Sequence, residues 1–240
     1  MALRFMEERI DFAAAFRWAA RLGWQTGICN HFSWMVDDRH ILINPRGLFW
    51  SEITASNLVL LDGDDNIVEG GDEVEETAFF VHVPTHRMNP AAKIILHAHT
   101  PHATALACIK DGELKWCSQD ALKFYGKVIY DREFNGSVLD AREGERIARK
   151  LGNHQIMFMA HHGVSVIGQN IAHALNDFYL LEDICRVQIL AQSSGQELAI
   201  IPDVEIDRIM SMPSGHDPQV APHFAAIKRV LDREEPSYRN

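Results

Sequence analysis

The sequence predicts a single α/β domain in which helices and strands pack in layers. Segments with helical spacing of apolar residues alternate along the whole chain with short β-branched runs, as in mixed α and β proteins. The 240 residues are enough for one sizeable hydrophobic core. Because no repeat, low-complexity tract or convincing linker divides the sequence, we expect one domain over residues 1–240.

The first half of the chain opens with a helix and continues in short strands. Apolar side chains share one face over residues 5–22, and Gly23 is placed to end this helix. A glycine-containing loop at 27–33 follows, and apolar runs at 41–43 and 58–61 predict strands. An acidic turn at 62–65 separates the second run from a new apolar start at 67–68, which indicates a hairpin.

The second half continues the alternation with longer helices. Pro90 limits a helix predicted over 77–88, and Pro101 suits the first turn of a helix over 101–109. A strand over 93–99 connects these two helices. The pattern then predicts helices at 142–151, 171–192 and 216–232, and strands at 156–160 and 164–167.

Charge and composition narrow the class of protein. The net charge of −10 argues against nucleic acid or an anionic membrane as the main partner. No apolar stretch approaches the roughly 18 residues of a membrane span, and the N-terminus does not resemble a signal peptide, so we expect a cytoplasmic protein. The cysteines form no CxxC pair, which fits reduced thiols in that compartment.

The 13 histidines are many for this length, and several cluster at 97–102 and 161–162. His97 and His99 end an apolar strand two residues apart, so their side chains point to the same face. His162 precedes Gly163, which would allow a sharp turn that presents the ring. Three neutral imidazoles with an open position are typical of a catalytic divalent-metal site. A buried histidine is more often a hydrogen-bonded core residue, however, and spacing alone does not join His162 to the other two.

Five motifs follow one another over nearly the whole chain. They are Gly-Ile-Cys-Asn-His-Phe-Ser at 27–33, Ile-Asn-Pro-Arg-Gly-Leu at 43–48, Leu-His-Ala-His-Thr at 96–100, Ala-His-His-Gly at 160–163 and Glu-Pro-Ser-Tyr-Arg at 235–239. This series resembles the class II aldolase/adducin family in its adducin-like branch. The resemblance implies a three-layer α/β/α domain with a mixed, mainly antiparallel central sheet. It also implies one zinc or manganese ion per chain on His97, His99 and His162, with sites near the subunit interfaces of a homotetramer.

The sequence departs from the sugar-phosphate aldolases of this family where they bind phosphate. Their Ser-Ser-Glu triplet, which includes the catalytic Glu, falls on Glu76, Thr77 and Ala78. Glu76 would repel a phosphate. Arg46 stands where those aldolases have a small hydroxyl residue, and it could hold a carboxylate through two parallel hydrogen bonds. These changes favour a small molecule with a free carboxylate as the substrate.

Decarboxylases of hydroxylated aromatic or pyridine carboxylic acids belong to the same branch, and their product carbon must be reprotonated. His31 is the first candidate for this step and Tyr125 the second, while Glu75 or Glu76 could act as a substitute base. Arg46 could equally pair with a surface acid, and the aromatic candidates could be core or interface residues. The candidate substrate-binding residues are Asn30, Arg46, Gly47 and Thr77, together with Phe49 and Phe124, which could stack on a ring.

Three functions remain open on these grounds. The favoured one is a metal-dependent decarboxylase of a hydroxylated aromatic or heteroaromatic acid. The second is a metal-dependent aldolase or retro-aldolase acting on a non-phosphorylated carbonyl compound. The third is a non-catalytic assembly module like the head domain of adducin, and the three retained histidines count against it because a scaffold has no need of converging imidazoles.

Overall fold

The computed structural model describes residues 3–71, 73–212 and 217–240. The strands are β1 (His31–Met35), β2 (Ile41–Ile43), β3 (Val59–Leu61), β4 (Ile67–Glu69), β5 (Ile94–Ala98), β6 (Val128–Asp131), β7 (Ile156–Met159) and β8 (Gly163–Gly168). The α-helices are α1 (Met6–Arg21), α2 (Glu76–Met88), α3 (Pro101–Cys108), α4 (Ala141–Leu151), α5 (Ile171–Ser193), α6 (Asp203–Met210) and α7 (Val220–Glu234). Short 3-10 helices span Trp50–Glu52, Asp120–Phe124 and Pro236–Arg239.

The eight strands form one sheet in the order β4-β3-β2-β1-β5-β8-β7-β6. Each neighbouring pair is antiparallel except β6 and β7, which run parallel. The expected mixed, mainly antiparallel sheet is therefore confirmed. At its centre, His97 of β5 lies opposite His31 of β1 and opposite Ser165 of β8. This register gathers polar side chains in the middle of an otherwise apolar sheet.

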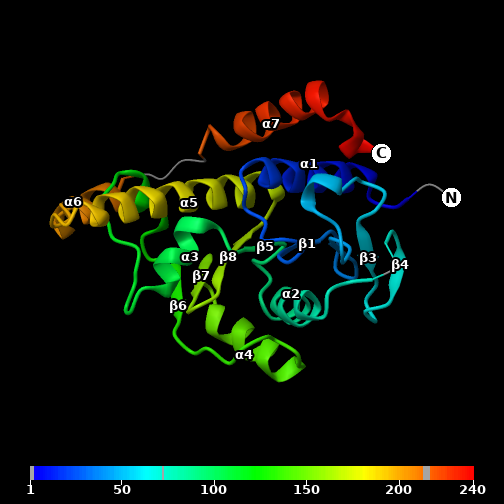
Figure 1. The fold of residues 1–240 in the computed structure, drawn as a ribbon, viewed down its shortest axis with the longest axis horizontal. Helices are drawn as coiled ribbons and strands as arrows, with labels where there is room; N and C mark the ends of the chain where they lie inside the picture. The colour runs from blue at the N-terminus through cyan, green and yellow to red at the C-terminus, as the bar shows by residue number, and fades with distance from the viewer. Residues whose placement is uncertain (1–2, 72, 213–216) are drawn as a thin grey trace.

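Helices cover both faces of the sheet, which confirms the three-layer α/β/α architecture (Figure 1). On one face lie α1, α3, α5 and α7, and the larger hydrophobic core fills the space between these helices and the strands. Its centre contains the stacked rings of Phe16 and Phe32, with Trp50 against both. On the other face, α2 and α4 enclose a smaller apolar cluster that includes Val81, Ile95 and Met157.

Close packing joins α2 to α4 at a proline. Pro84 lies inside α2, and because it has no N–H, the carbonyl of Phe80 loses its partner within the helix. Gly144 of α4 sits against this carbonyl, where a Cβ atom would stand only 1.9 Å from the oxygen. The glycine therefore allows α4 to approach α2, and this contact supports the layer that faces the histidines.

The sequence pattern predicts most of these elements but not all. Residues 31–33, expected in a loop, begin β1, because polar His31 and Ser33 on its inner face hide the alternation typical of a strand. The structure also contains two elements that were not predicted: β6, a short half-buried strand at the edge of the sheet, and α6, which buries Ile206 alone. His216, where the last predicted helix starts, lies outside the described residues. Among the described helices, none is both long and apolar enough to cross a bilayer.

Candidate metal centre

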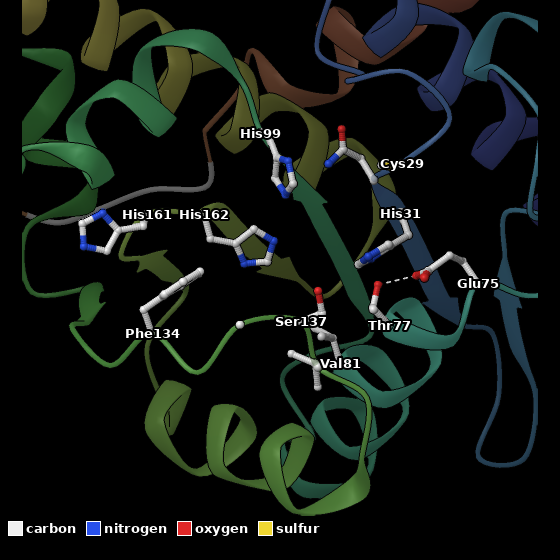
Figure 2. Close-up of a pocket in the computed structure, with 13 residues that line it drawn as sticks. Cys29, His31, Glu75, Thr77, Val81, His99, Phe134, Ser137, His161 and His162 are labelled. Carbon is white, nitrogen blue, oxygen red and sulfur yellow. Dashed lines mark hydrogen bonds between the residues drawn. The ribbon is translucent and has the colours of Figure 1, made fainter.

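Three histidines meet at the end of β5. His97 lies in the strand, His99 follows it, and His162 lies in the turn between β7 and β8. One ligand nitrogen from each histidine lies within 4.8 Å of the others. The ring centroids are 4.6 to 5.2 Å apart, and Figure 2 shows the rings of His99 and His162 directed toward one another. The sheet thus joins His162 to the pair that the strand spacing indicated.

Gly163 positions this group by close packing rather than by a left-handed turn. Its φ is not positive, and it is the first residue of β8. A Cβ atom here would lie 2.6 Å from Cδ2 of His99 and 2.7 Å from the carbonyl oxygen of Ala98. The left-handed residue of the turn is His161 instead, with φ of 58°. Glycine is therefore required so that His99 can stand beside the turn.

The state of the three rings fits a divalent ion. Nε2 of His99 is buried, and within the described part of the chain it has no hydrogen-bond partner. Nδ1 of His97 lies 3.1 Å from Oγ of Ser165, which leaves Nε2 of His97 as the ligand atom. Burial lowers the pKa of His162 to about 4 and that of His97 well below its usual range, so both rings are neutral near pH 7. Neutral imidazole is the form that binds zinc or manganese.

A cavity of about 440 Å³ opens beside the three histidines. None of the described residues that line it is a lysine or an arginine. Its walls come from the 29–31 segment, the start of α2, the 134–138 segment and the 161–162 turn (Figure 2). The lining residues are Cys29, Asn30, His31, Glu75, Thr77, Val81, His99, Phe134, Gly136, Ser137, Val138, His161 and His162.

Three of the predicted catalytic and substrate-binding residues line this cavity. Asn30 adopts a left-handed conformation with φ of 80°, which aims its amide at the 26–30 turn, where Oδ1 accepts a 2.8 Å hydrogen bond from the N–H of Thr26. Its Nδ2 is buried and has no partner among the described residues. His31 stacks on His97 with ring centroids 5.0 Å apart. Thr77 donates a hydrogen bond to Glu75 at the edge of the cavity (Figure 2).

The predicted charged and turn residues lie elsewhere in this chain. Arg46 is exposed and forms an ion pair with Glu73, so its guanidinium does not line the cavity. Gly47, with φ of 86°, shapes the same exposed turn. Glu76 begins α2 but is exposed, because the helix turns its side chain away from the histidines. Arg46 thus pairs with a surface acid, one of the two alternatives that the sequence leaves open.

The predicted aromatic residues also lie outside the cavity. Phe124 is fully buried in the larger core, where its ring packs against apolar side chains and does not reach the cavity. Phe49 precedes the 3-10 helix Trp50–Glu52 and is 52% exposed. Tyr125 packs edge-on against Trp116, with ring centroids 5.2 Å apart. The aromatic side chain that does line the cavity is Phe134, which also contacts the ring of His161.

Glu75 is the acidic residue that the structure places in the cavity in preference to Glu76. It is the N-cap of α2, and its Oε2 accepts hydrogen bonds from the hydroxyl of Thr77 and from the N–H of Ala78. Burial raises the pKa of this carboxyl, but the hydrogen bonds outweigh burial and lower it. The sequence shows two adjacent acids, and only the cap geometry decides which one turns inward.

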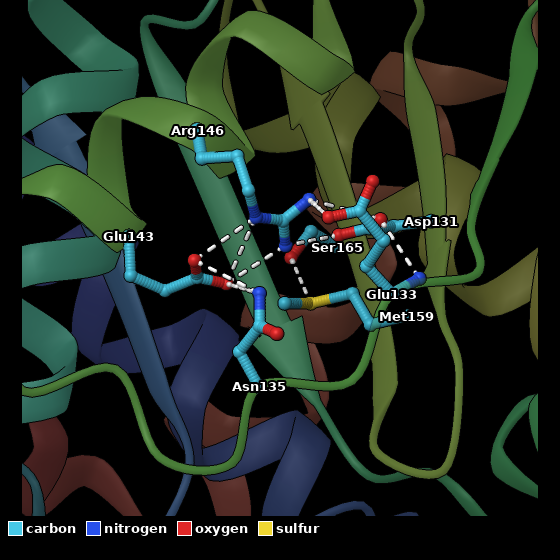
Figure 3. A network of polar contacts seen from close by, with 7 residues as sticks. All are labelled: Asp131, Glu133, Asn135, Glu143, Arg146, Met159 and Ser165. Carbon is cyan, nitrogen blue, oxygen red and sulfur yellow. Dashed lines mark hydrogen bonds and ion pairs between the residues drawn. The ribbon is translucent and has the colours of Figure 1, made fainter.

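An ion-pair network holds the 134–138 wall of the cavity (Figure 3). The guanidinium of Arg146 in α4 forms two hydrogen bonds, of 2.7 and 3.1 Å, with buried Asp131. The same guanidinium binds Glu143, whose carboxylate accepts from Nδ2 of Asn135. The segment that carries Phe134 is therefore fastened to α4 and to the end of β6.

The profile described as Class II Aldolase and Adducin N-terminal domain matches residues 10–189. The chain belongs to this family. A putative aldolase class 2 protein of Pseudomonas aeruginosa is 32% identical, with 97% of this chain and 92% of that protein covered. The decarboxylase NovR of Streptomyces niveus is 33% identical over 77% of this chain and 69% of its own. A 4-hydroxy-3-prenylphenylpyruvate oxygenase/4-hydroxy-3-prenylbenzoate synthase of Streptomyces roseochromogenus is 32% identical over 76% of this chain and 67% of its own.

Solved structures agree with the family's fold. An aldolase II superfamily protein from Pseudomonas syringae superposes with a TM-score of 0.91 at 36% identity, covering 100% of this chain and 98% of that one. An L-fuculose 1-phosphate aldolase from Glaciozyma antarctica has a TM-score of 0.83 at 24% identity, covering 100% and 96%. The second similarity shows the shared fold alone. Family membership and fold were both expected from the motifs, and both are confirmed.

Proposed function

We propose that this protein is a divalent-metal-dependent carbon–carbon lyase that decarboxylates a hydroxylated aromatic or heteroaromatic carboxylic acid. The observation that carries the proposal is the convergence of His97, His99 and His162 beside a cavity, with Nε2 of His99 buried and unpaired among the described residues. Those three rings would hold zinc or manganese. When bound, the ion supplies a Lewis acid that stabilises negative charge on substrate oxygens.

The charge of the cavity supports a carboxylate substrate over a sugar phosphate. A phosphate placed away from the three histidines would face the Glu75 carboxylate, and no described lining residue carries a positive charge to offset the repulsion. A carboxylate placed against the three histidines needs no such partner, since the site itself would be cationic when loaded. The cavity volume of about 440 Å³ is of the size that holds a single-ring compound.

Each lining group has a role in this reaction. Val81, Val138 and Phe134 supply apolar surface for the ring. Asn30, whose Nδ2 lacks a partner among the described residues, would donate a hydrogen bond to a substrate oxygen. His31 would take the proton from a substrate hydroxyl and return it to the carbon that loses carbon dioxide, which is general acid–base catalysis. The name of one relative, the decarboxylase NovR, supports the reaction, and the name of the other, a 4-hydroxy-3-prenylphenylpyruvate oxygenase/4-hydroxy-3-prenylbenzoate synthase, supports a hydroxylated aromatic acid.

One observation favours aldol chemistry as the second candidate. Glu75 brings a carboxylate into the cavity although Ala78 occupies the position of the family's catalytic Glu. Hydrogen bonds from Thr77 and Ala78 keep this carboxylate ionised, so it could accept a proton as an aldolase requires. In this case the substrate would be a non-phosphorylated carbonyl compound, and the product would include an aldehyde.

We also propose a cytoplasmic homotetramer with its sites near subunit interfaces, as the family resemblance implies. Large apolar side chains support it, since Phe134 and Leu139 flank the cavity wall and are 58% and 57% exposed. Exposed apolar groups of this kind are typical of surfaces that a partner covers. Light scattering coupled to size-exclusion chromatography should give a mass of four chains, and the mass of one chain would contradict the proposal.

The test of the lyase begins with metal analysis of the purified protein beside His99→Ala. We expect about one zinc or manganese ion per chain, by the stoichiometry of one three-histidine site, and its loss in the variant. His154→Ala, at a half-buried histidine outside the cavity, is the control and should keep the ion. A panel of hydroxybenzoates and hydroxypyridine carboxylates is then assayed for carbon dioxide. Aldehyde release from carbonyl compounds would favour the aldolase, and a protein that takes up no metal would contradict both enzymes.

A further inference from the structure

A chain of hydrogen-bonded side chains runs from the cavity into the layer between the sheet and α2. Nδ1 of His31 lies 2.6 Å from Nε2 of His82, and Nδ1 of His82 is bonded to Oγ of Ser33. Oγ of Ser33 lies 2.7 Å from Nε2 of His86, and Nδ1 of His86 lies 2.5 Å from the carbonyl oxygen of Ala92. The four side chains are all buried, at 6% exposure or less.

The carbonyl at the inner end sets the direction of every bond. A carbonyl oxygen only accepts, so Nδ1 of His86 must carry a proton. Its Nε2 is then an acceptor in the neutral ring, and the hydroxyl of Ser33 must donate to it. Because this hydroxyl has used its single proton, it accepts from Nδ1 of His82.

The remaining two links follow in the same way. With its proton on Nδ1, the neutral ring of His82 offers only a lone pair at Nε2, so Nδ1 of His31 must donate to it. Burial lowers the pKa of His86 to about 4 and that of His82 well below its usual range. Both inner rings are therefore neutral near pH 7, as this assignment of donors and acceptors requires.

We infer that Ser33, His82 and His86 are positioning residues that hold His31 in the tautomer with its proton on Nδ1 and its Nε2 lone pair toward the cavity. Among the described residues, none is hydrogen-bonded to Nε2 of His31, and the ring lines the cavity while stacking on His97. The cavity therefore contains a fixed hydrogen-bond acceptor next to the three-histidine group. In the lyase proposed above, on which this step rests, a hydroxyl of the substrate donates its hydrogen bond to this atom.

This arrangement selects the substrate as well as orienting it. A substrate whose hydroxyl stands against Nε2 of His31 is paired there, whereas an analogue with an acceptor at the same place sets two lone pairs against each other. The hydrogen-bonded series also keeps the proton of His31 on Nδ1, so Nε2 has no proton to donate to the substrate.

Neutron diffraction from deuterium-exchanged crystals of the purified protein tests the assignment directly. We expect a deuteron on Nδ1 and none on Nε2 in each of His31, His82 and His86, and a Ser33 deuteron directed at His86. In Ser33→Ala, His82 loses its acceptor, so deuteron density at His31 should divide between its two nitrogens. Thr85→Val is the matched control, since it removes a buried hydroxyl of α2 whose hydrogen bond, among the described residues, goes to the carbonyl of Val81. It should leave His31 as in the wild type.

Kinetics provide a second readout if the lyase reaction is found. We expect Ser33→Ala to lower kcat about 10- to 100-fold, the usual effect of removing an orienting hydrogen bond, while Thr85→Val stays near the wild-type rate. Ser33→Thr restores the hydroxyl and should recover part of the rate. A deuteron on Nε2 of His31 in the wild type, or an unchanged His31 in Ser33→Ala, would overturn the inference. Because neutron diffraction needs no catalytic activity, absence of lyase activity would contradict the proposed function and would leave the hydrogen-bond assignment to be tested by diffraction.

Discussion

His86, the innermost ring of the hydrogen-bonded series that starts at His31, makes the stability of the protein depend on pH. Its folded pKa is about 4, against 6.5 for an unperturbed ring, because burial penalises the charged form. Between these values the unfolded chain binds a proton that the folded chain does not, so stability falls as pH falls. We expect His86 to account for a loss of about 2 kcal/mol in the free energy of unfolding between pH 7 and pH 5.

Urea unfolding at the two pH values measures this contribution. His86→Gln should flatten the dependence by that amount, whereas Thr85→Val, which leaves His86 and its hydrogen bonds in place, should keep the wild-type slope. Equal slopes in wild type and His86→Gln would show that the folded protein binds a proton at His86 as readily as the unfolded chain does. That result would also conflict with the direction assigned to its hydrogen bonds.

At the scale of single residues, the sequence predicts metal-ligating types better than it predicts contacts. The two-residue spacing predicts that His97 and His99 lie together. The structure places their ring centroids 5.2 Å apart, although β5 ends at Ala98 and His99 follows it. Glu75 and Glu76 differ only in which one caps α2, and no periodicity in the sequence distinguishes them. His82 and His86 lie four residues apart on α2, a spacing that puts them on one face, yet their partners lie on β1.

At the scale of elements, the turn between β7 and β8 depends on Gly163. In Gly163→Ala the new methyl group would meet the backbone carbonyl of Ala98, which cannot move without disturbing the β5–β8 pairing. We expect a loss of about 1–3 kcal/mol in stability, together with weaker metal binding because His99 is displaced. Gly168→Ala at the other end of β8 would place its methyl group 3.0 Å from Cβ of Ala174 and 3.3 Å from the Cα and N atoms of the same residue, away from the histidines. It should lower stability without lowering the affinity for zinc, which calorimetric titration with zinc measures.

The junction of α4 with β6 depends on one arginine. Asp131 is 2% exposed, and Arg146 is the cation that binds both of its oxygens. In Arg146→Met the buried carboxylate loses this partner, and we expect a loss of about 3 kcal/mol or more. Arg149→Met, which breaks the exposed pair with Glu145 on the same helix, should change stability by about 0.5 kcal/mol or less. Similar urea midpoints for the two variants would contradict a structural role for Arg146.

At the scale of the whole molecule, the order of the strands is the part that the sequence pattern alone does not supply. The neighbours of β5 are β1 and β8, which come from segments about 60 residues away on either side. Apolar runs indicate where strands occur but not which strands pair, so the three-layer architecture followed from the family motifs. The same long-range pairing places His31, His97 and Ser165 side by side, and no local pattern predicts that row.

The metal should couple the site to the stability of the entire fold. His97, His99 and His162 come from segments that meet only when the sheet has formed, so the folded chain binds an ion far better than the unfolded chain. With free ion at about 100 times its dissociation constant, we expect a gain of about 2.7 kcal/mol. For a chain of this size this raises Tm by about 5–10 °C. Scanning calorimetry of chelator-treated protein, with and without added zinc or manganese, measures the shift.

Variants distinguish binding of the ion at the three histidines from binding elsewhere, because only the former makes the rise in Tm depend on His99. His99→Ala should abolish the rise in Tm, because two imidazoles leave the ion without its third nitrogen, while Thr85→Val should retain it although its own Tm is lower. A rise of equal size in His99→Ala would mean that the ion binds exposed carboxylates of this acidic chain instead. A rise confined to proteins with all three histidines would show that the ion binds at the three-histidine site. The pairing of β5 with β8 that forms the sheet would then also form the metal site.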